Sequence, residues 1–331
     1  MFAFVAWRAS LRNRADWIGT SAQRRLMAAK YLLRALSLPL RHQRFLRFLQ
    51  GQPLLRAWVA RDPRLQERHL HRFVNRHWRR RERLAAVQSH YRVLLQHWPA
   101  ALFEAVYLRG RATLGELTLK DGQVLQLHLC PPIQSGCEGE LTLELSDLEQ
   151  RPLYRLVLTL IDARTLAIGC LQGPSGTQGR EQVRALTRQM HGLRPKQLMM
   201  SLVYAFAARH GIARVLAIGG AAHPLSRRDR FLADYDGYWR ELGGMLGADG
   251  WFALPPALPH RDVAEVESRH RAAFRRREQL CAAAQAMLTD ALHPTPWSMD
   301  PASTLESPPT HAENPGEALW SDPSRLPAIP A

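Results

Sequence analysis

The spacing of apolar residues changes near residue 112, from a helical period to a period of two. Residues 1–60 carry leucines at helical spacing among arginines, with two interrupting prolines, and this pattern predicts amphipathic helices. Asp62 and Pro63 are suited to the N-cap and the first position of a helix, which predicts a further helix running to Trp98. The first third of the chain is therefore predicted to be helical.

Alternation of apolar and polar residues begins with ATLGELTLK and continues with QVLQLHLC. Asp121-Gly122 lies between these runs, and an Asp-Gly pair flanked by alternating segments is a strong hairpin pattern. Further strands are predicted at 140–145, 153–161 and 165–171. The sheet is therefore expected to start as an antiparallel meander.

The next part of the chain predicts a crossover. A helix at 180–190 and a second at 196–210 separate strand 165–171 from the apolar run at 214–219, and such a connection joins parallel strands. Helix 196–210 is apolar almost all round, so it must be covered by other elements. The predicted fold class is α+β: a mixed, mostly antiparallel sheet that ends in a parallel crossover, preceded by a basic helical region.

Three regions are predicted along the chain. Residues 1–110 form the basic helical region, and residues 111–290 form the α/β core, which closes with a helix from Asp262 to about Leu288. Residues 291–331 form a tail, whose last 39 positions include nine prolines and few large apolar groups. That composition is typical of a segment that cannot bury enough apolar surface to fold.

Charge is concentrated at one end of the chain. The net charge is +16, and residues 1–99 hold 21 Lys/Arg against 4 Asp/Glu, whereas the remainder holds 24 against 25. An anionic membrane surface, an acidic protein or nucleic acid would suit such a segment, although a solvated basic helix face is the plainer alternative. No sequence-specific nucleic-acid motif is present, so that class is not expected. The candidate contact residues are Arg24, Arg25, Arg79, Arg80 and Arg81.

The compartment and metal chemistry follow from cysteines and histidines. The four cysteines show neither disulfide-scaffold nor metal spacing, the first residues make a poor signal peptide, and no apolar run approaches the roughly 20 residues of a membrane span. We expect a cytoplasmic protein and leave open a peripheral position at the inner membrane. His90 and Tyr91 lie in a leucine-rich segment and are predicted to point inward. Histidines before residue 100 lack accompanying ligands at metal spacing, so no metal is predicted.

Two loops around helix 196–210 carry the candidate chemistry. Gly192, Arg194 and Lys196 stand at the helix start, where free N–H groups and the positive end of the dipole favour an anion such as a pyrophosphate. The alternative is that these are ordinary surface charges beside a helix-starting Pro195. The stretch is thus one end of a predicted ligand site.

His223 follows the predicted buried strand and is the candidate general base, with Asp234 and Asp236 as groups that could orient it or a substrate amine. The alternative is a loop histidine that caps a backbone carbonyl. No Ser-His-Asp or Cys-His arrangement can be recognised.

An ordered set of motifs resembles the bacterial VirK/YbjX family: HYRVL from His90, HGLRPKQLM from His191, YDGYWRELGG from Tyr235 and the basic HRAAFRRR. The resemblance covers about residues 60–285. It implies a Gram-negative protein that acts in envelope defence, virulence or the response to host antimicrobial peptides, without an established biochemical activity. The loop GGAAHPLSRRDR departs from the family pattern before His223.

The predicted element order is also similar to the acyl-CoA N-acyltransferase fold, in which the cofactor pyrophosphate binds at the start of the helix after the fourth strand. This sequence lacks the usual Q/R-x-x-G-x-G/A loop and has the additional helix 180–190. The similarity implies acyl transfer from acyl-CoA or an acyl carrier protein. The alternative is a non-catalytic binding or regulatory protein that docks anionic lipid, acidic protein or nucleic acid through its basic first third.

Overall fold

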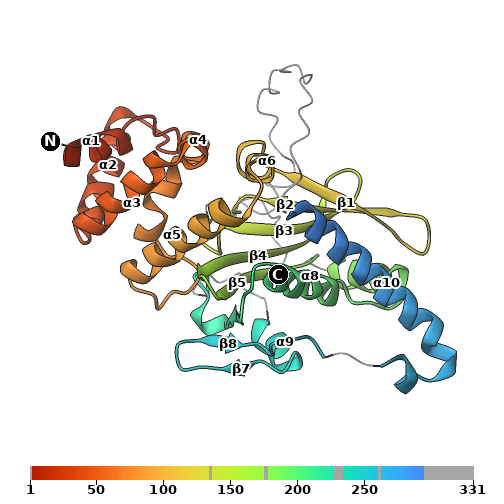
Figure 1. The fold of residues 1–331 in the computed structure, drawn as a ribbon. Helices are drawn as coiled ribbons and strands as arrows, with labels where there is room; N and C mark the ends of the chain where they lie inside the picture. The colour runs from red at the N-terminus through yellow and green to blue at the C-terminus, as the bar shows by residue number, and fades with distance from the viewer. Residues whose placement is uncertain (1, 134–135, 175–177, 227–233, 260–261, 294–331) are drawn as a thin grey trace, which may run out of the picture.

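The chain folds around an eight-stranded sheet, as shown by a computed structural model that describes residues 2–133, 136–174, 178–226, 234–259 and 262–293 (Figure 1). Within these ranges the strand order is β1-β2-β3-β4-β5-β6-β8-β7, with β5 and β6 as the parallel neighbours. The prediction of a mixed, mostly antiparallel sheet is confirmed. The strands are β1 (Ala112–Thr118), β2 (Val124–Cys130), β3 (Leu141–Ser146), β4 (Pro152–Asp162), β5 (Thr165–Gln172), β6 (Arg214–Ile218), β7 (Met245–Leu246) and β8 (Trp251–Ala253).

The predicted hairpin between β1 and β2 is confirmed. Gly122 has a φ of +85°, a left-handed conformation that glycine adopts without a side-chain penalty. Asp121 Oδ1 accepts a hydrogen bond of 3.1 Å from the backbone N–H of Gln123. The turn sets a register in which Leu117 and Leu125 lie opposite each other, and both are buried.

The sheet does not end in the parallel crossover, so that part of the predicted fold class is wrong. β8 pairs antiparallel with β6, where Ile218 lies opposite Trp251, and β7 pairs with β8 beyond it. Strands of two and three residues are too short to show a period-two pattern, which is why the sequence did not predict them. β6 is therefore an interior strand, which accounts for the buried Val215 and Ala217.

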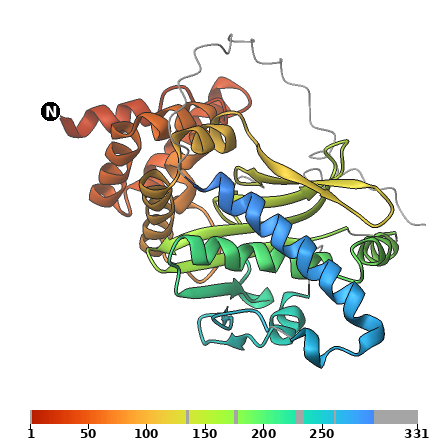
Figure 2. The same cartoon turned by 45° about the vertical axis from the view of Figure 1, so that its right-hand side comes forward.

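Helices gather at one end of the sheet (Figures 1 and 2). Pro39 and Pro53 do not merely interrupt this region: each occupies the first turn of a new helix, where its missing N–H costs nothing. The elements before β1 are α1 (Phe2–Ser10), α2 (Ser21–Ala35), α3 (Pro39–Gly51), α4 (Pro53–Arg61), the 3₁₀ helix η1 (Pro63–Leu70), α5 (Arg80–His97), α6 (Ala100–Phe103) and the π-helical turn η2 (Glu104–Leu108).

The predicted continuous helix from Asp62 to Trp98 is wrong. Asp62 does cap a helix start, but the helix is η1, and α5 begins only at Arg80. Between them the chain is held by the rest of the fold: Val74 has a φ of +48° and its N–H donates to Cys137 O at 2.7 Å. Tertiary hydrogen bonds thus override a local helix pattern in this segment.

The predicted burial of helix 196–210 is confirmed. This helix, α8 (Pro195–Arg209), packs against the sheet, and α10 (Ser268–Ala291) crosses over it (Figure 2). α7 (Gly179–Gln189) precedes α8, and α9 (Tyr235–Glu241) follows β6. The side chain of Gln285 on α10 donates to Ser201 O on α8 at 3.4 Å. α8 is therefore covered on both sides, as its apolar surface requires.

One continuous hydrophobic core joins the helical end to the sheet. Its buried members run from Phe45 in α3 to Leu292 after α10, and α5 packs on β4. A second, smaller cluster lies inside the first helices and consists of Trp17, Tyr31, Ala35 and Leu70. The predicted boundary at residue 110 falls where helices give way to strands. Whether the two sides fold independently stays a prediction, and residues 294–331 of the predicted tail lie outside the described residues.

A buried ion pair connects the helical end to the sheet. The guanidinium of Arg68 in η1 lies 2.6 Å from Glu140 Oε2, just before β3, and their side chains are 2% and 0% exposed. Asp62 also pairs with Arg68, and the hydroxyl of Tyr91 donates to Glu140 Oε2 at 2.6 Å. Removing either charge from water is energetically costly, so each of the two buried ions depends on the other to offset its desolvation.

Replacing Glu140 by Ala should lower the free energy of unfolding by about 3–5 kcal/mol, because Arg68 is then left buried beside the partial compensation of Asp62 alone. Glu149→Ala removes an exposed carboxylate and should change it by less than about 0.5 kcal/mol. Urea denaturation measures both. Equal, small effects of the two substitutions would contradict the assigned role of the pair.

A chain of hydrogen bonds runs through the small cluster. The Tyr31 hydroxyl donates to Ser10 Oγ at 2.8 Å, so at its 2.7 Å contact with His42 Nε2 it accepts. His42 Nδ1 is then bare and accepts from His69 Nε2 at 3.1 Å. Both imidazoles are fully buried and neutral in this arrangement, and burial lowers the pKa of His42 to about 4.

Acidification should therefore destabilise the protein. A histidine in the unfolded chain takes up a proton near pH 6.5 and folded His42 near pH 4, so between these values the unfolded state binds more protons. Stability is present above pH 6.5 and is lost as the pH falls, by roughly 2 kcal/mol from His42 alone between pH 7 and 5. His42→Gln should flatten this dependence in urea denaturation, whereas the exposed His97→Gln should not. An unchanged pH dependence in His42→Gln would refute the assignment.

Candidate functional site

The two parallel strands part before β5 ends. β5 and β6 are paired up to Ile168 and Ala217, after which β5 continues to Gln172 on its β4 side and β6 turns toward β8. Among the described residues, no strand therefore lies beside the β6-facing edge of β5 beyond Ile168. Buried backbone N–H and C=O groups must be hydrogen-bonded, so this edge needs partners from elsewhere in the chain.

His223 supplies one of these partners. The residue follows the short 3₁₀ helix η4 (Gly220–Ala222), is fully buried, and its Nε2 lies 3.1 Å from Gly169 O on β5. Its Nδ1 accepts from Leu225 N at 3.2 Å, which assigns the proton to Nε2. The structure thus gives the predicted general base a carbonyl-capping contact, the alternative considered for it from sequence.

The carboxylate beside His223 is that of Glu138. Glu138 Oε1 lies 3.1 Å from His223 Nε2, and both side chains are almost completely buried. The backbone of Glu138 passes so close to Gly169 that any side chain at Gly169 would overlap the Glu138 carbonyl. Gly169 therefore permits the approach that brings this carboxylate to the imidazole.

Tyr235, at the start of α9, is the second side chain that contacts the β6-facing edge of β5. We call the space between this edge and the end of β6 the gap between β5 and β6. Its hydroxyl accepts from Leu171 N at 3.4 Å and donates to Cys170 Sγ at 3.4 Å, and its ring centre lies 5.5 Å from that of His223. Burial, with the neighbouring Cys170 and Glu138, raises the pKa of Tyr235 well above its usual value. Burial likewise raises the pKa of Cys170, so this thiol is not an activated nucleophile.

The two predicted aspartates serve the local backbone. Asp234 caps α9 by accepting from Gly237 N at 3.0 Å. Asp236 Oδ1 accepts from Gly220 N at 2.7 Å, which ties η4 to α9. They position the segment that carries His223 and Tyr235, and their proposed catalytic role stays a prediction.

The residues predicted to bind an anion, Gly192, Arg194 and Lys196, lie at the start of α8. We call this the anion end of the predicted site. Arg194 forms an ion pair with Glu241, and Lys196 Nζ lies 4.8 Å above the ring centre of Tyr238. Gly192 has a φ of +84°, and a side chain there would meet the guanidinium of Arg277. Arg194 and Lys196 thus have partners on α9 before any ligand is considered.

Further cations surround this helix start. His191 has a φ of +57°, uncommon for a residue with a side chain, and its carbonyl accepts from Arg277 Nε on α10 at 2.7 Å. Burial and the charges of Arg276, Lys120 and Arg277 lower the pKa of His191. Cations from the β1–β2 hairpin and from α10 therefore meet at one turn, an arrangement that sequence spacing could not indicate.

α9 contacts both parts of the predicted site, the His223 part and the anion end at the start of α8. Tyr235 contacts the His223 side, Tyr238 lies under Lys196, and Glu241 pairs with Arg194. These three positions are spaced by three residues and span about 9 Å of helix. Sequence reasoning placed both ends on the stretch 191–223 and missed α9 as the element that both ends contact.

The predicted basic contact residues lie on the helical end. Arg24 and Arg25 are exposed on α2, while Arg79, Arg80 and Arg81 surround the start of α5. Arg80 Nη1 donates to Ser37 Oγ at 2.7 Å, so the start of α5 lies beside the end of α2. Their role in contacting a membrane or an acidic partner stays a prediction.

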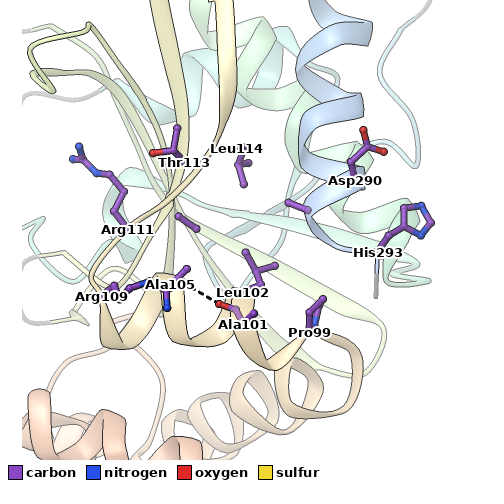
Figure 3. A pocket seen from close by; sticks show the side chains of 12 residues that line it. Pro99, Ala101, Leu102, Ala105, Arg109, Arg111, Thr113, Leu114, Asp290 and His293 are labelled. Atoms are coloured by element: carbon purple, nitrogen blue, oxygen red, sulfur yellow. Dashed lines mark hydrogen bonds between the residues drawn. The ribbon is translucent and has the colours of Figure 1, made fainter. Parts of the chain in front are cut away.

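A groove of about 420 Å³ lies elsewhere, between η2, β1 and the end of α10 (Figure 3). Leu102 and Leu114 provide apolar walls, with Arg111 near one end and His293 near the other. Arg111 is already paired with Glu144 at 2.7 Å. None of the residues predicted as catalytic or anion-binding lines this groove.

In the described ranges no three His, Cys, Asp or Glu side chains converge as metal ligands do, and the four cysteines there are free thiols. No helix in the same ranges combines the length and apolar character needed to cross a bilayer.

Glu138 and Glu140 were missed by sequence reasoning. They flank Gly139 immediately before an apolar strand, and acidic residues rarely enter a buried strand without a partner. That pattern was the available indication. Their partners, His223 and Arg68, are too far away in the sequence to be identified from it.

The comparisons with known proteins agree on one family. The profile described as "Protein of unknown function (DUF535)" matches residues 20–290. The uncharacterized protein YbjX of Escherichia coli (strain K12) is 30% identical over 275 residues, covering 80% of this chain and 83% of YbjX. Membrane protein LapB of Mannheimia haemolytica is 28% identical over 182 residues, covering 53% of this chain and 75% of LapB. No solved structure matches this chain significantly.

A pair of tyrosine substitutions tests the hydrogen bond between Tyr235 and the β5 backbone. Tyr235→Phe should lower the free energy of unfolding by about 1–2 kcal/mol, because Leu171 N is then buried without its acceptor. Tyr238→Phe is the matched control: its buried hydroxyl has no hydrogen-bond partner among the described residues, so its loss should be neutral or slightly stabilising. Urea denaturation at neutral pH distinguishes them, and the reverse ranking would contradict the assigned contacts.

Proposed function

We propose that this chain, which belongs to the DUF535 family, transfers an acyl group from a thioester donor to an amine. Membership agrees with the VirK/YbjX resemblance found in the sequence. The family is described as one of unknown function, so the proposal depends on the fold and the site of this chain.

Strand order is the observation that carries the proposal. β5 and β6 are parallel, α7 and α8 lie between them, and the chain returns through α9 to the antiparallel pair β7 and β8 in the order β5-β6-β8-β7. This order, after an antiparallel meander, is similar to the acyl-CoA N-acyltransferase fold. Ligands of sheets with parallel strands commonly bind beyond the carboxyl ends of the strands, where two neighbouring strands part.

The parted strands offer a fitting donor site. Gly169 O and Leu171 N form an extended edge whose present partners are side-chain atoms of His223 and Tyr235. An extended amide-containing arm, such as pantetheine, would pair with such an edge as an added strand does. Donor binding would therefore require these side chains to withdraw from the β5 backbone.

Once released from the β5 backbone, His223 and Tyr235 are suited to the proton transfers of acyl transfer from a thioester to an amine. The amine nitrogen bonds to the thioester carbonyl carbon, the carbon–sulfur bond breaks, the amine loses one proton and the leaving thiolate gains one. His223, freed from Leu225 N, would take the first proton, and Glu138 would stabilise the imidazolium. The hydroxyl of Tyr235, which already donates to a sulfur atom, would supply the second.

Phosphate groups of the donor would be held at the start of α8. Arg277 and Lys120 lie near His191, and Lys196 lies on the first turn of α8, although the usual pyrophosphate loop of acyl-CoA transferases is absent. An acyl carrier protein, which presents its arm on an acidic protein surface, suits this departure as well as acyl-CoA does. We place the reaction in envelope defence, as the VirK/YbjX resemblance implies.

Donor binding should raise the melting temperature of the full chain. At a free concentration about 100 times Kd, acyl-CoA or acyl carrier protein adds about 2.7 kcal/mol, which corresponds to roughly 5 °C or more. Under the same conditions with an amine acceptor, thiol release should be detected and should fall about 100-fold or more in Tyr235→Phe but not in Tyr238→Phe. If no donor shifts the melting temperature, the proposal fails.

A non-catalytic binding protein is the second candidate. Its support is the burial of the proposed catalytic groups, since His223 is 0% and Tyr235 4% exposed. This candidate predicts a melting-temperature shift with donor but no thiol release above the rate without protein. The acyltransferase proposal predicts both.

A further inference from the structure

α2 is apolar on two opposite faces. Its inner face contributes Tyr31 and Ala35, which are 1% and 0% exposed, to the small cluster of the helical end. Its outer face presents Leu26 and Leu33, which are 53% and 74% exposed, and the C-cap residue Leu36, which is 63% exposed, continues this face. A surface helix normally covers its outer face with polar groups, so this second apolar face needs an explanation.

The outer residues form a continuous stripe. Together with two exposed alanines they make a row from Ala22 to Leu36 in which the residues are spaced by four and three positions, and the row is about 21 Å long because a helix rises about 1.5 Å per residue. Leu40, at the start of α3, and Ile18, before α2, are also exposed, at 68% and 74%. We call the row the outer stripe of α2; its members are Ala22, Leu26, Ala29, Leu33 and Leu36.

The segment that carries the stripe is basic and contains no acidic residue. Between residues 17 and 61 the sequence contains nine Lys/Arg and no Asp or Glu. Arg25 and Lys30 are exposed on opposite sides of the stripe, as the helical period requires. Arg80 extends the basic rim past the end of α2 through its bond to Ser37.

We propose that the outer stripe of α2 docks this protein on an anionic lipid surface. The leucines enter the boundary between headgroups and acyl chains, while Arg25, Lys30 and their neighbours contact the lipid phosphates. An amphipathic helix with a basic rim binds such interfaces because apolar burial and charge attraction act together. This inference is independent of the proposed acyl transfer.

The fold supports this occupant over a second copy of the chain. Two copies meeting through the stripe would bring their basic segments together, and such like-charge contacts are repulsive. α2 is already folded and held through Tyr31, whose hydroxyl donates to Ser10 Oγ at 2.8 Å and contacts His42. Binding therefore requires no ordering of the helix, which removes a cost that disordered membrane anchors incur.

Vesicle flotation of the full chain tests the inference. The protein should float with phosphatidylcholine vesicles that contain about one third phosphatidylglycerol and not with phosphatidylcholine alone, and binding should weaken as salt is raised from about 0.1 M to about 0.5 M. The combined substitution Leu26→Gln, Leu33→Gln and Leu36→Gln should reduce the bound-to-free ratio about 10-fold or more. Arg25→Glu with Lys30→Glu should have a comparable effect.

The matched control changes exposed apolar residues elsewhere: Leu148→Gln, Met245→Gln and Leu246→Gln should leave flotation unchanged. All substitutions are on the surface, and equal melting temperatures will show that each variant is folded. Equal flotation of the wild type and the leucine variant, or equal binding to both vesicle types, would overturn the proposal. A wild-type dimer in sedimentation that the leucine substitutions convert to a monomer, without a change in flotation, would assign the stripe to a second copy and also overturn it.

Discussion

The candidate site depends on one edge of β5, which has no neighbouring strand in the part of the chain that the structure describes. β6 stops pairing with β5 at Ala217, while β5 continues into the interior with a carbonyl at Gly169 and an N–H at Leu171 that cannot remain unsatisfied. The chain meets this need with side chains, His223 and Tyr235. The same contacts hold those two groups beside Glu138 and Cys170, so a requirement of backbone hydrogen bonding has collected the chemistry of the site.

A short acidic segment couples the gap to the helical end. Glu138 turns toward His223, whereas Glu140, two residues later, turns toward Arg68. Gly139 between them has a φ of +152°, and a side chain there would meet the β4 strand. This short segment therefore supplies one buried carboxylate to His223 and another to Arg68. The position of the segment links the packing of η1 and α5 to the geometry of the gap between β5 and β6.

The sequence predicted what local periodicity controls and missed what tertiary contacts decide. The hairpin at Asp121-Gly122 and the buried α8 were predictable because each has a strong pattern of its own. The break before Arg80, the strands β7 and β8, and the partner of His223 were not, because they depend on contacts between distant segments. The histidine and the anion end could be proposed from loop positions, but α9 as their common neighbour could be seen only in the fold.

Hydrogen exchange read peptide by peptide, with and without an acyl-thioester donor, tests the account most directly. If the donor pairs with the β6-facing edge of β5 beyond Ile168, amides in residues 168–172 should exchange more slowly, and the contacts released by Tyr235 should change exchange at the start of α9. If a bound donor leaves both segments unchanged and protects other segments alone, the gap between β5 and β6 is not the donor site.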